Sequence, residues 1–114
     1  AYEAKNSCYI NEGVVISKYT GRGGKYDTSD ASAEYMGKVR ALLEKNNVMW
    51  QVGELGKVDM GGGGTIAKYV ANMNVDVVDL GVPVLCMHAP FEIVSKIDVY
   101  MAYRAFFAFF DDKI

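Results

Sequence analysis

Short β-prone runs alternate with segments of helical periodicity along this chain, and that alternation restricts its fold more than any other feature. Four runs are rich in β-branched or other apolar residues, at positions 13–19, 48–52, 75–80 and 82–87. Three segments, 31–45, 65–71 and 95–110, show helical spacing or a helix-start signal. Strands that alternate with helices are typical of α/β domains, so the predicted fold class is α/β.

The first long helix is expected over residues 31–45. Met36, Val39 and Leu43 recur there at the spacing of one helix face, which indicates that these three side chains enter the core. The polar run 27–30 precedes the segment and offers side-chain oxygens of the kind found at helix N-termini. We therefore expect that run to cap the helix.

The last helix is expected to start at Ser95. Ser95 and Asp98 have the spacing of a capping box in which Asp replaces Glu. The side chains that share one face of this helix are Val99, Tyr103, Phe106 and Phe110. We interpret the aromatic face as part of the core or as a contact between subunits.

Composition limits the class of protein. A length of 114 residues with 51% hydrophobic residues fits one packed domain. The 12 basic and 14 acidic residues give a net charge of −2, so no nucleic-acid partner is expected. The longest apolar stretch, 99–110, contains Arg104 and is too short to cross a bilayer. Cys8 and Cys86 form no CxxC pair, which favours reduced thiols in a cytoplasmic protein.

His88 is the only histidine and directly follows the run 82–87. The end of a strand is where α/β enzymes often place working side chains, and an imidazole there can ligate a metal or move protons. A core or surface histidine held by one hydrogen bond is the alternative. A zinc site needs three or four ligands, and spacing does not show which acidic residues would join His88.

Four consecutive glycines, 61–64, follow Asp59 and lead into Thr65. Glycines allow backbone N–H groups to approach a carboxylate, a phosphate or a developing oxyanion at a helix start. A connecting turn is the alternative interpretation. The loop lacks the Gly-Lys-Ser/Thr ending of a P-loop, so nucleotide binding ranks last among the hypotheses.

A second glycine turn, near Gly21, is surrounded by three cations and a phenol: Lys18, Arg22, Lys25 and Tyr26. Such a group can clamp an anionic part of a substrate. A solvated loop is the other interpretation.

Three ordered motifs in this chain resemble bacterial M18 aminopeptidases, which are aspartyl aminopeptidase-like zinc metallopeptidases. The motifs are VGELGKVDMGGGGTIA at 52–67, DLGVPVL at 79–85 and MHAPFE at 87–92. The similarity extends upstream through 18–26 and downstream through 96–110, and so covers nearly the whole chain. It implies a zinc-exopeptidase-type α/β/α sandwich with a mixed sheet, in which residues 1–114 form the C-terminal part of the catalytic domain.

The resemblance also implies an activity and roles for individual residues. Members of the family hold two zinc ions, remove N-terminal residues from peptides, often acidic ones, and assemble as dodecamers. Matched by motif, His88 corresponds to the last histidine ligand of the zinc site. Lys18 and Tyr26 correspond to residues near the substrate, and Gly62 and Gly63 are expected to border the same cleft.

The family's other zinc ligands, and the Glu-Glu pair that holds its general base, have no counterpart in this chain and are expected upstream of Ala1. The chain opens on Ala-Tyr-Glu, and we expect it to be part of a longer enzyme and inactive by itself. A hypothesis from another class is a noncatalytic α/β module that acts in assembly through its aromatic helix.

Overall fold

The computed structural model describes residues 7–22, 26–53 and 66–112. In chain order its elements are β1 (Val14–Ser17), β2 (Tyr19–Arg22), β3 (Tyr26–Asp30), α1 (Ala33–Lys45), β4 (Trp50–Val52), α2 (Ala67–Ala71), β5 (Asp79–Gly81) and α3 (Lys96–Asp111). Helices and strands alternate, which confirms the predicted α/β class. Within these ranges no helix has the length and apolar character that a membrane span needs.

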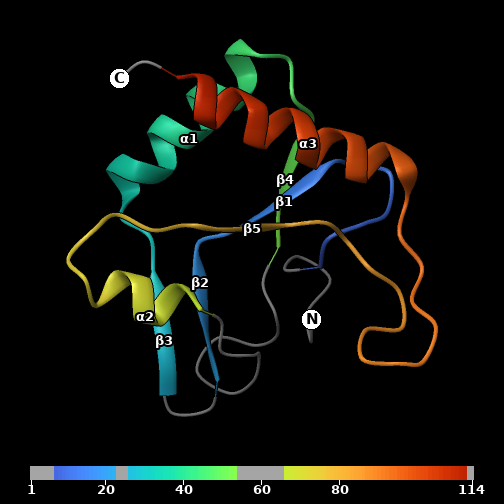
Figure 1. The fold of residues 1–114 in the computed structure, drawn as a ribbon, viewed down its shortest axis with the longest axis horizontal. Coiled ribbons are helices and arrows are strands. Elements are labelled where there is room, and N and C mark those ends of the chain that lie inside the picture. Colours follow the sequence, from blue (N-terminus) through green and yellow to red (C-terminus); the bar gives the residue numbers. More distant parts are fainter. Residues whose placement is uncertain (1–6, 23–25, 54–65, 113–114) are drawn as a thin grey trace.

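The central sheet is mixed and has three strands in the order β4-β1-β5. β1 runs parallel to β4, with Val15 opposite Gln51, and antiparallel to β5, with Ile16 opposite Leu80. The connection from β1 to β4 contains α1, because parallel neighbours need a long crossover. A separate ribbon pairs β2 with β3, and α2 lies beside it (Figure 1).

The core lies between the central sheet and the helices α1 and α3, which lie together over the strands in Figure 1. Val14 and Ile16 of β1 are fully buried and point to this side. The helix residues packed on them are Met36, Val39 and Leu43 of α1 and Ala105 of α3. The three core residues predicted for the first helix are thus confirmed.

The N-terminus of α1 is set by Ser32. The Ser32 hydroxyl oxygen accepts a hydrogen bond from the Tyr35 N–H at 3.1 Å, which satisfies one of the free donors at the helix start. The predicted capping by residues 27–30 is wrong, because these residues belong to β3 and pair with β2.

The observed strands are shorter than the predicted runs. The run 13–19 is interrupted at Lys18, whose carbonyl oxygen accepts the Ala31 N–H at 2.8 Å, and β2 begins at the next residue. The run 48–52 is a strand only from Trp50, and the run 75–80 only from Asp79.

The strand predicted over residues 82–87 is wrong. Among the residues that the structure describes, the only pairing in this run is an isolated antiparallel bridge between Leu85 and Ile93. Cys86 has a φ of 62°, a left-handed value that ends the extended conformation directly after the bridge. His88 therefore lies in a loop rather than at the end of a strand.

The helix predicted from Ser95 is confirmed as α3, but Asp98 does not close a capping box. Ser95 is the N-cap and accepts the Ile97 N–H at 3.2 Å. The Asp98 carboxylate is fully buried and accepts the backbone N–H groups of Asn11 at 2.9 Å and Gly13 at 2.8 Å. Asp98 thus ties the start of α3 to the segment that enters β1.

The side chains of the aromatic face of α3 are each about half exposed or more in this chain, so they are not part of its buried core. Ala105 and Ala108 face the core instead, and their small side chains let the helix approach the sheet. Val99 is 48% exposed, Tyr103 62%, Phe106 47% and Phe110 80%. The role of this face as a contact surface stays a prediction.

Candidate functional site

His88 lies in a loop that two backbone hydrogen bonds close. The Leu85 N–H donates to the Ile93 carbonyl at 2.9 Å, and the Ile93 N–H donates to the Leu85 carbonyl at 3.2 Å. Inside the loop, the Ala89 N–H donates to the Cys86 carbonyl at 3.0 Å and forms a four-residue turn. His88 is the third residue of this turn and has a φ of 69°, a value that Gly or Asn usually supplies there.

The Glu92 carboxylate contacts this turn. Its Oε1 accepts the backbone N–H of His88 at 2.6 Å. The bond uses the main chain of His88 and leaves the imidazole nitrogens available for another partner. The His88 side chain is exposed in this chain, so among the residues that the structure describes it is a surface histidine.

A hollow of about 530 Å3 lies beside the loop, on the face of the sheet that carries Val15. Its lining combines the end of β1 at Ser17, the start of β5 at Asp79, and Met87. Ser17 directly precedes Lys18, and Met87 directly precedes His88. Two candidates far apart in the sequence are therefore both adjacent to the lining of one hollow.

The structure describes the other predicted site residues, Lys18, Tyr26, Gly62 and Gly63, only in part. Lys18 is half-buried and follows β1. Tyr26 is the first residue of β3 and pairs with Arg22, but its side chain lies outside the part of the chain that the structure describes. Gly62 and Gly63 lie outside the described residues. The substrate-binding roles of all four residues stay predictions.

The imidazole of His88 is exposed and is of a type that can ligate a metal. Within 7–22, 26–53 and 66–112, no three His, Cys, Asp or Glu side chains are grouped in a way that could hold a metal ion. A catalytic zinc site typically has three protein ligands, of which an exposed imidazole is one suitable type. The described residues thus fit a zinc ion only as one contributor to its coordination.

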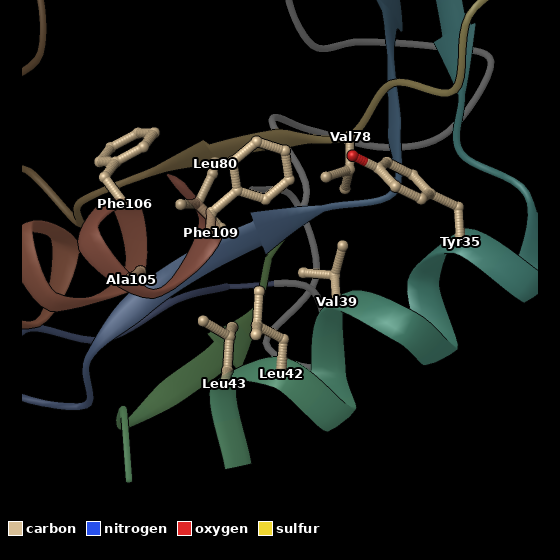
Figure 2. Close-up of a pocket in the computed structure, with 9 residues that line it drawn as sticks. All are labelled: Tyr35, Val39, Leu42, Leu43, Val78, Leu80, Ala105, Phe106 and Phe109. Carbon is tan, nitrogen blue, oxygen red and sulfur yellow. The ribbon is translucent and has the colours of Figure 1, made fainter. Parts of the chain in front are cut away.

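A smaller hollow of about 150 Å3 lies between α1, α3 and β5 (Figure 2). Its lining residues are Tyr35, Val39, Leu42, Leu43, Val78, Leu80, Ala105, Phe106 and Phe109. Apart from the Tyr35 hydroxyl, these side chains are apolar and offer no group for catalysis. We interpret this hollow as a packing gap in the core.

Tyr35 makes stability depend on pH in the alkaline range. Burial raises the pKa of its phenol above the ordinary value of 10.0, and the negative charge of Asp76 adds to the shift. A raised pKa in the folded state means that folding favours the protonated phenol. This contribution is fully present below the ordinary pKa and is lost as the pH rises through the folded-state pKa.

We expect the free energy of unfolding to fall more steeply between about pH 9 and about pH 11 in the unaltered chain than in Tyr35→Phe. Urea unfolding, followed by the fluorescence of the single tryptophan, Trp50, measures both slopes. Because the other titrating groups are common to both proteins, equal slopes would contradict the expectation.

The chain is similar to a known protein family over nearly its whole length. The family model for the aminopeptidase I zinc metalloproteases (M18) matches residues 1–110. The chain belongs to the M18 family. A probable M18 family aminopeptidase 1 from Thermotoga neapolitana is 54% identical over 111 residues, which are 97% of this chain and 25% of that protein.

Solved structures of M18 enzymes share the fold of this chain. Aminopeptidase I from Clostridium acetobutylicum matches with a TM-score of 0.90 at 48% identity, over 97% of this chain and 24% of that one. An M18 aminopeptidase from Thermotoga maritima matches with a TM-score of 0.88 at 48% identity, over 94% of this chain and 24% of that one. This M18 chain spans about a quarter of the length of these relatives.

Two residues of this M18 chain have roles in the structure that the sequence pattern does not indicate. Glu92 ends the motif MHAPFE, but only the folded loop brings its carboxylate to the His88 N–H. Asp98 has the spacing of a capping residue, and its partners, Asn11 and Gly13, are distant in sequence. In the sequence, the signal for an unusual role of Asp98 is that a carboxylate stands in a mostly apolar helix stretch.

Proposed function

We propose that this chain is the C-terminal part of the catalytic domain of a two-zinc aminopeptidase, and that His88 supplies one zinc ligand. The observation that carries the proposal is the exposed imidazole of His88 at a left-handed turn position. A non-glycine residue in such a conformation costs about 1–3 kcal/mol, and such strain is concentrated at functional sites. Membership of the M18 family supports the same assignment.

A bound zinc ion polarises a carbonyl and lowers the pKa of a coordinated water. The chain's own residues would act around that centre. His88 would ligate as a neutral imidazole. The Lys18 ammonium and the Tyr26 phenol would bind the substrate, with Lys18 suited to an acidic N-terminal side chain. Gly62 and Gly63 would allow the peptide to approach the backbone closely.

The parent enzyme, meaning the full-length protein that carries this chain, tests the proposal. We expect it to release N-terminal residues from peptides, acidic ones fastest, to lose nearly all activity after treatment with a chelator, and to regain activity with Zn²⁺. Residues 1–114 expressed alone should hydrolyse nothing, because one imidazole does not make a coordination sphere. Activity that survives chelation, or hydrolysis by the 114-residue chain, would contradict the proposal.

We also propose that the parent enzyme is cytoplasmic and forms a homo-oligomer, a dodecamer as the family resemblance implies. The free thiols of Cys8 and Cys86 support a reducing compartment. The exposed aromatic face of α3 is the surface of this chain best suited to a subunit contact. Light scattering of the purified parent enzyme measures the number of subunits.

A further inference from the structure

We propose that Glu92 is a positioning residue that holds the backbone of His88 in the conformation needed for zinc ligation. The inference rests on the proposed function, because it assumes that His88 is a zinc ligand. It adds a role for a side chain that does not itself touch the metal. The bond that carries it joins Glu92 Oε1 to the His88 N–H at 2.6 Å.

Glu92 is well placed to act as a fixed support. It directly precedes Ile93, which is tied to Leu85 by two backbone hydrogen bonds. Its main chain is therefore anchored at the closed end of the loop, and its side chain reaches back to the turn. A carboxylate that accepts a backbone N–H makes a shorter and stronger bond than a neutral acceptor does.

The turn holds two non-glycine residues in the left-handed region, an uncommon conformation that persists where the surrounding structure supports it. Cys86 has a φ of 62° and His88 a φ of 69°, and neither is glycine. The direction of the His88 Cα–Cβ bond depends on these backbone angles. Metal ligands must be held within about 0.5 Å of their working position, so a relaxed turn would misplace the imidazole.

Two mechanisms link Glu92 to the metal, and they predict different results. As a hydrogen-bond acceptor, Glu92 fixes the turn, and a glutamine oxygen can replace its Oε1. As a charge, it would attract the cation directly, and glutamine would fail. The bond is directed to the main chain of His88, and this geometry favours the first mechanism.

The test uses four variants of the parent enzyme: Glu92→Ala, Glu92→Gln, His88→Asn and Glu44→Ala. Glu44→Ala is the matched control, because Glu44 is an exposed glutamate near the end of α1. The measurements are the zinc dissociation constant, from competition with a chromogenic chelator, and the thermal midpoint of the metal-free protein. We expect Glu92→Ala to weaken zinc binding by ~10–100-fold, the range found for residues that orient metal ligands. Glu92→Gln should recover most of that loss. The thermal midpoint of metal-free Glu92→Gln should lie close to that of the control, Glu44→Ala.

Each outcome decides one point. If His88→Asn weakens zinc binding and Glu92→Ala does not, the positioning role is wrong and the proposed function stands. If Glu92→Gln loses as much affinity as Glu92→Ala, Glu92 acts through its charge and the positioning role is wrong. If His88→Asn leaves zinc binding unchanged, His88 is no ligand, and both proposals fail.

Discussion

Replacing His88 with asparagine in the parent enzyme is expected to lower kcat/KM for peptide hydrolysis by on the order of 10³-fold or more, together with zinc affinity. Loss of a residue that only orients a ligand typically costs ~10–100-fold, so loss of a ligand itself should exceed that range. Asparagine is the informative substitution because it tolerates the φ of 69° at this position. Alanine would combine loss of the imidazole with backbone strain.

His88→Asp is the partner variant, because a carboxylate both tolerates the left-handed conformation and ligates zinc. It should recover part of the zinc affinity that His88→Asn loses. Glu44→Ala, on the exposed side of α1, should match the unaltered enzyme in both measurements. Zinc content and kcat/KM near those of the unaltered enzyme in His88→Asn would exclude His88 as a ligand.

Replacing Asp98 with asparagine is expected to destabilise the chain by about 2–4 kcal/mol. The Asp98 carboxylate is fully buried and accepts two N–H groups, from Asn11 and Gly13. The asparagine amide has one oxygen, so its NH₂ group would face a second donor. A buried donor without an acceptor costs ~1–3 kcal/mol, and the donor-donor contact adds to that.

Asp111→Asn is the matched control, because Asp111 is an exposed aspartate at the end of the same helix, α3. It should change the free energy of unfolding by less than about 0.5 kcal/mol. Urea unfolding followed by Trp50 fluorescence measures both variants. A loss no larger for Asp98→Asn than for Asp111→Asn would show that the two buried hydrogen bonds contribute little.

Gly13 adds a second constraint on the segment that enters β1, next to Asp98. Its φ is 100°, and a Cβ atom added there would lie 2.2 Å from the Met49 carbonyl oxygen. Only glycine fits that close approach, which places the Gly13 N–H within reach of Asp98. The start of α3 and the start of β1 are therefore held together by one carboxylate and one glycine.

The sequence by itself determined the α/β class, the helices near 33–45 and 96–111, and the family. Periodicity specifies these features because a helix buries one face of its own residues, as Met36, Val39 and Leu43 do. The motif MHAPFE is likewise a sequence feature, and it predicted a site role for His88, whose side chain the structure leaves exposed.

Only the tertiary structure decided whether an apolar run forms a strand and which groups the carboxylates bond to. The run 82–87 is apolar and β-prone, but within 7–22, 26–53 and 66–112 it has no strand partner beyond the Leu85–Ile93 bridge, and it turns at Cys86. The roles of Glu92 and Asp98 depend on hydrogen bonds that form when the chain closes on itself. The local sequence around a carboxylate near a helix start is the same whether the carboxylate accepts N–H groups of its own helix or of a distant loop. The tertiary structure decides which N–H groups it accepts, because a buried donor must pair with an acceptor within reach.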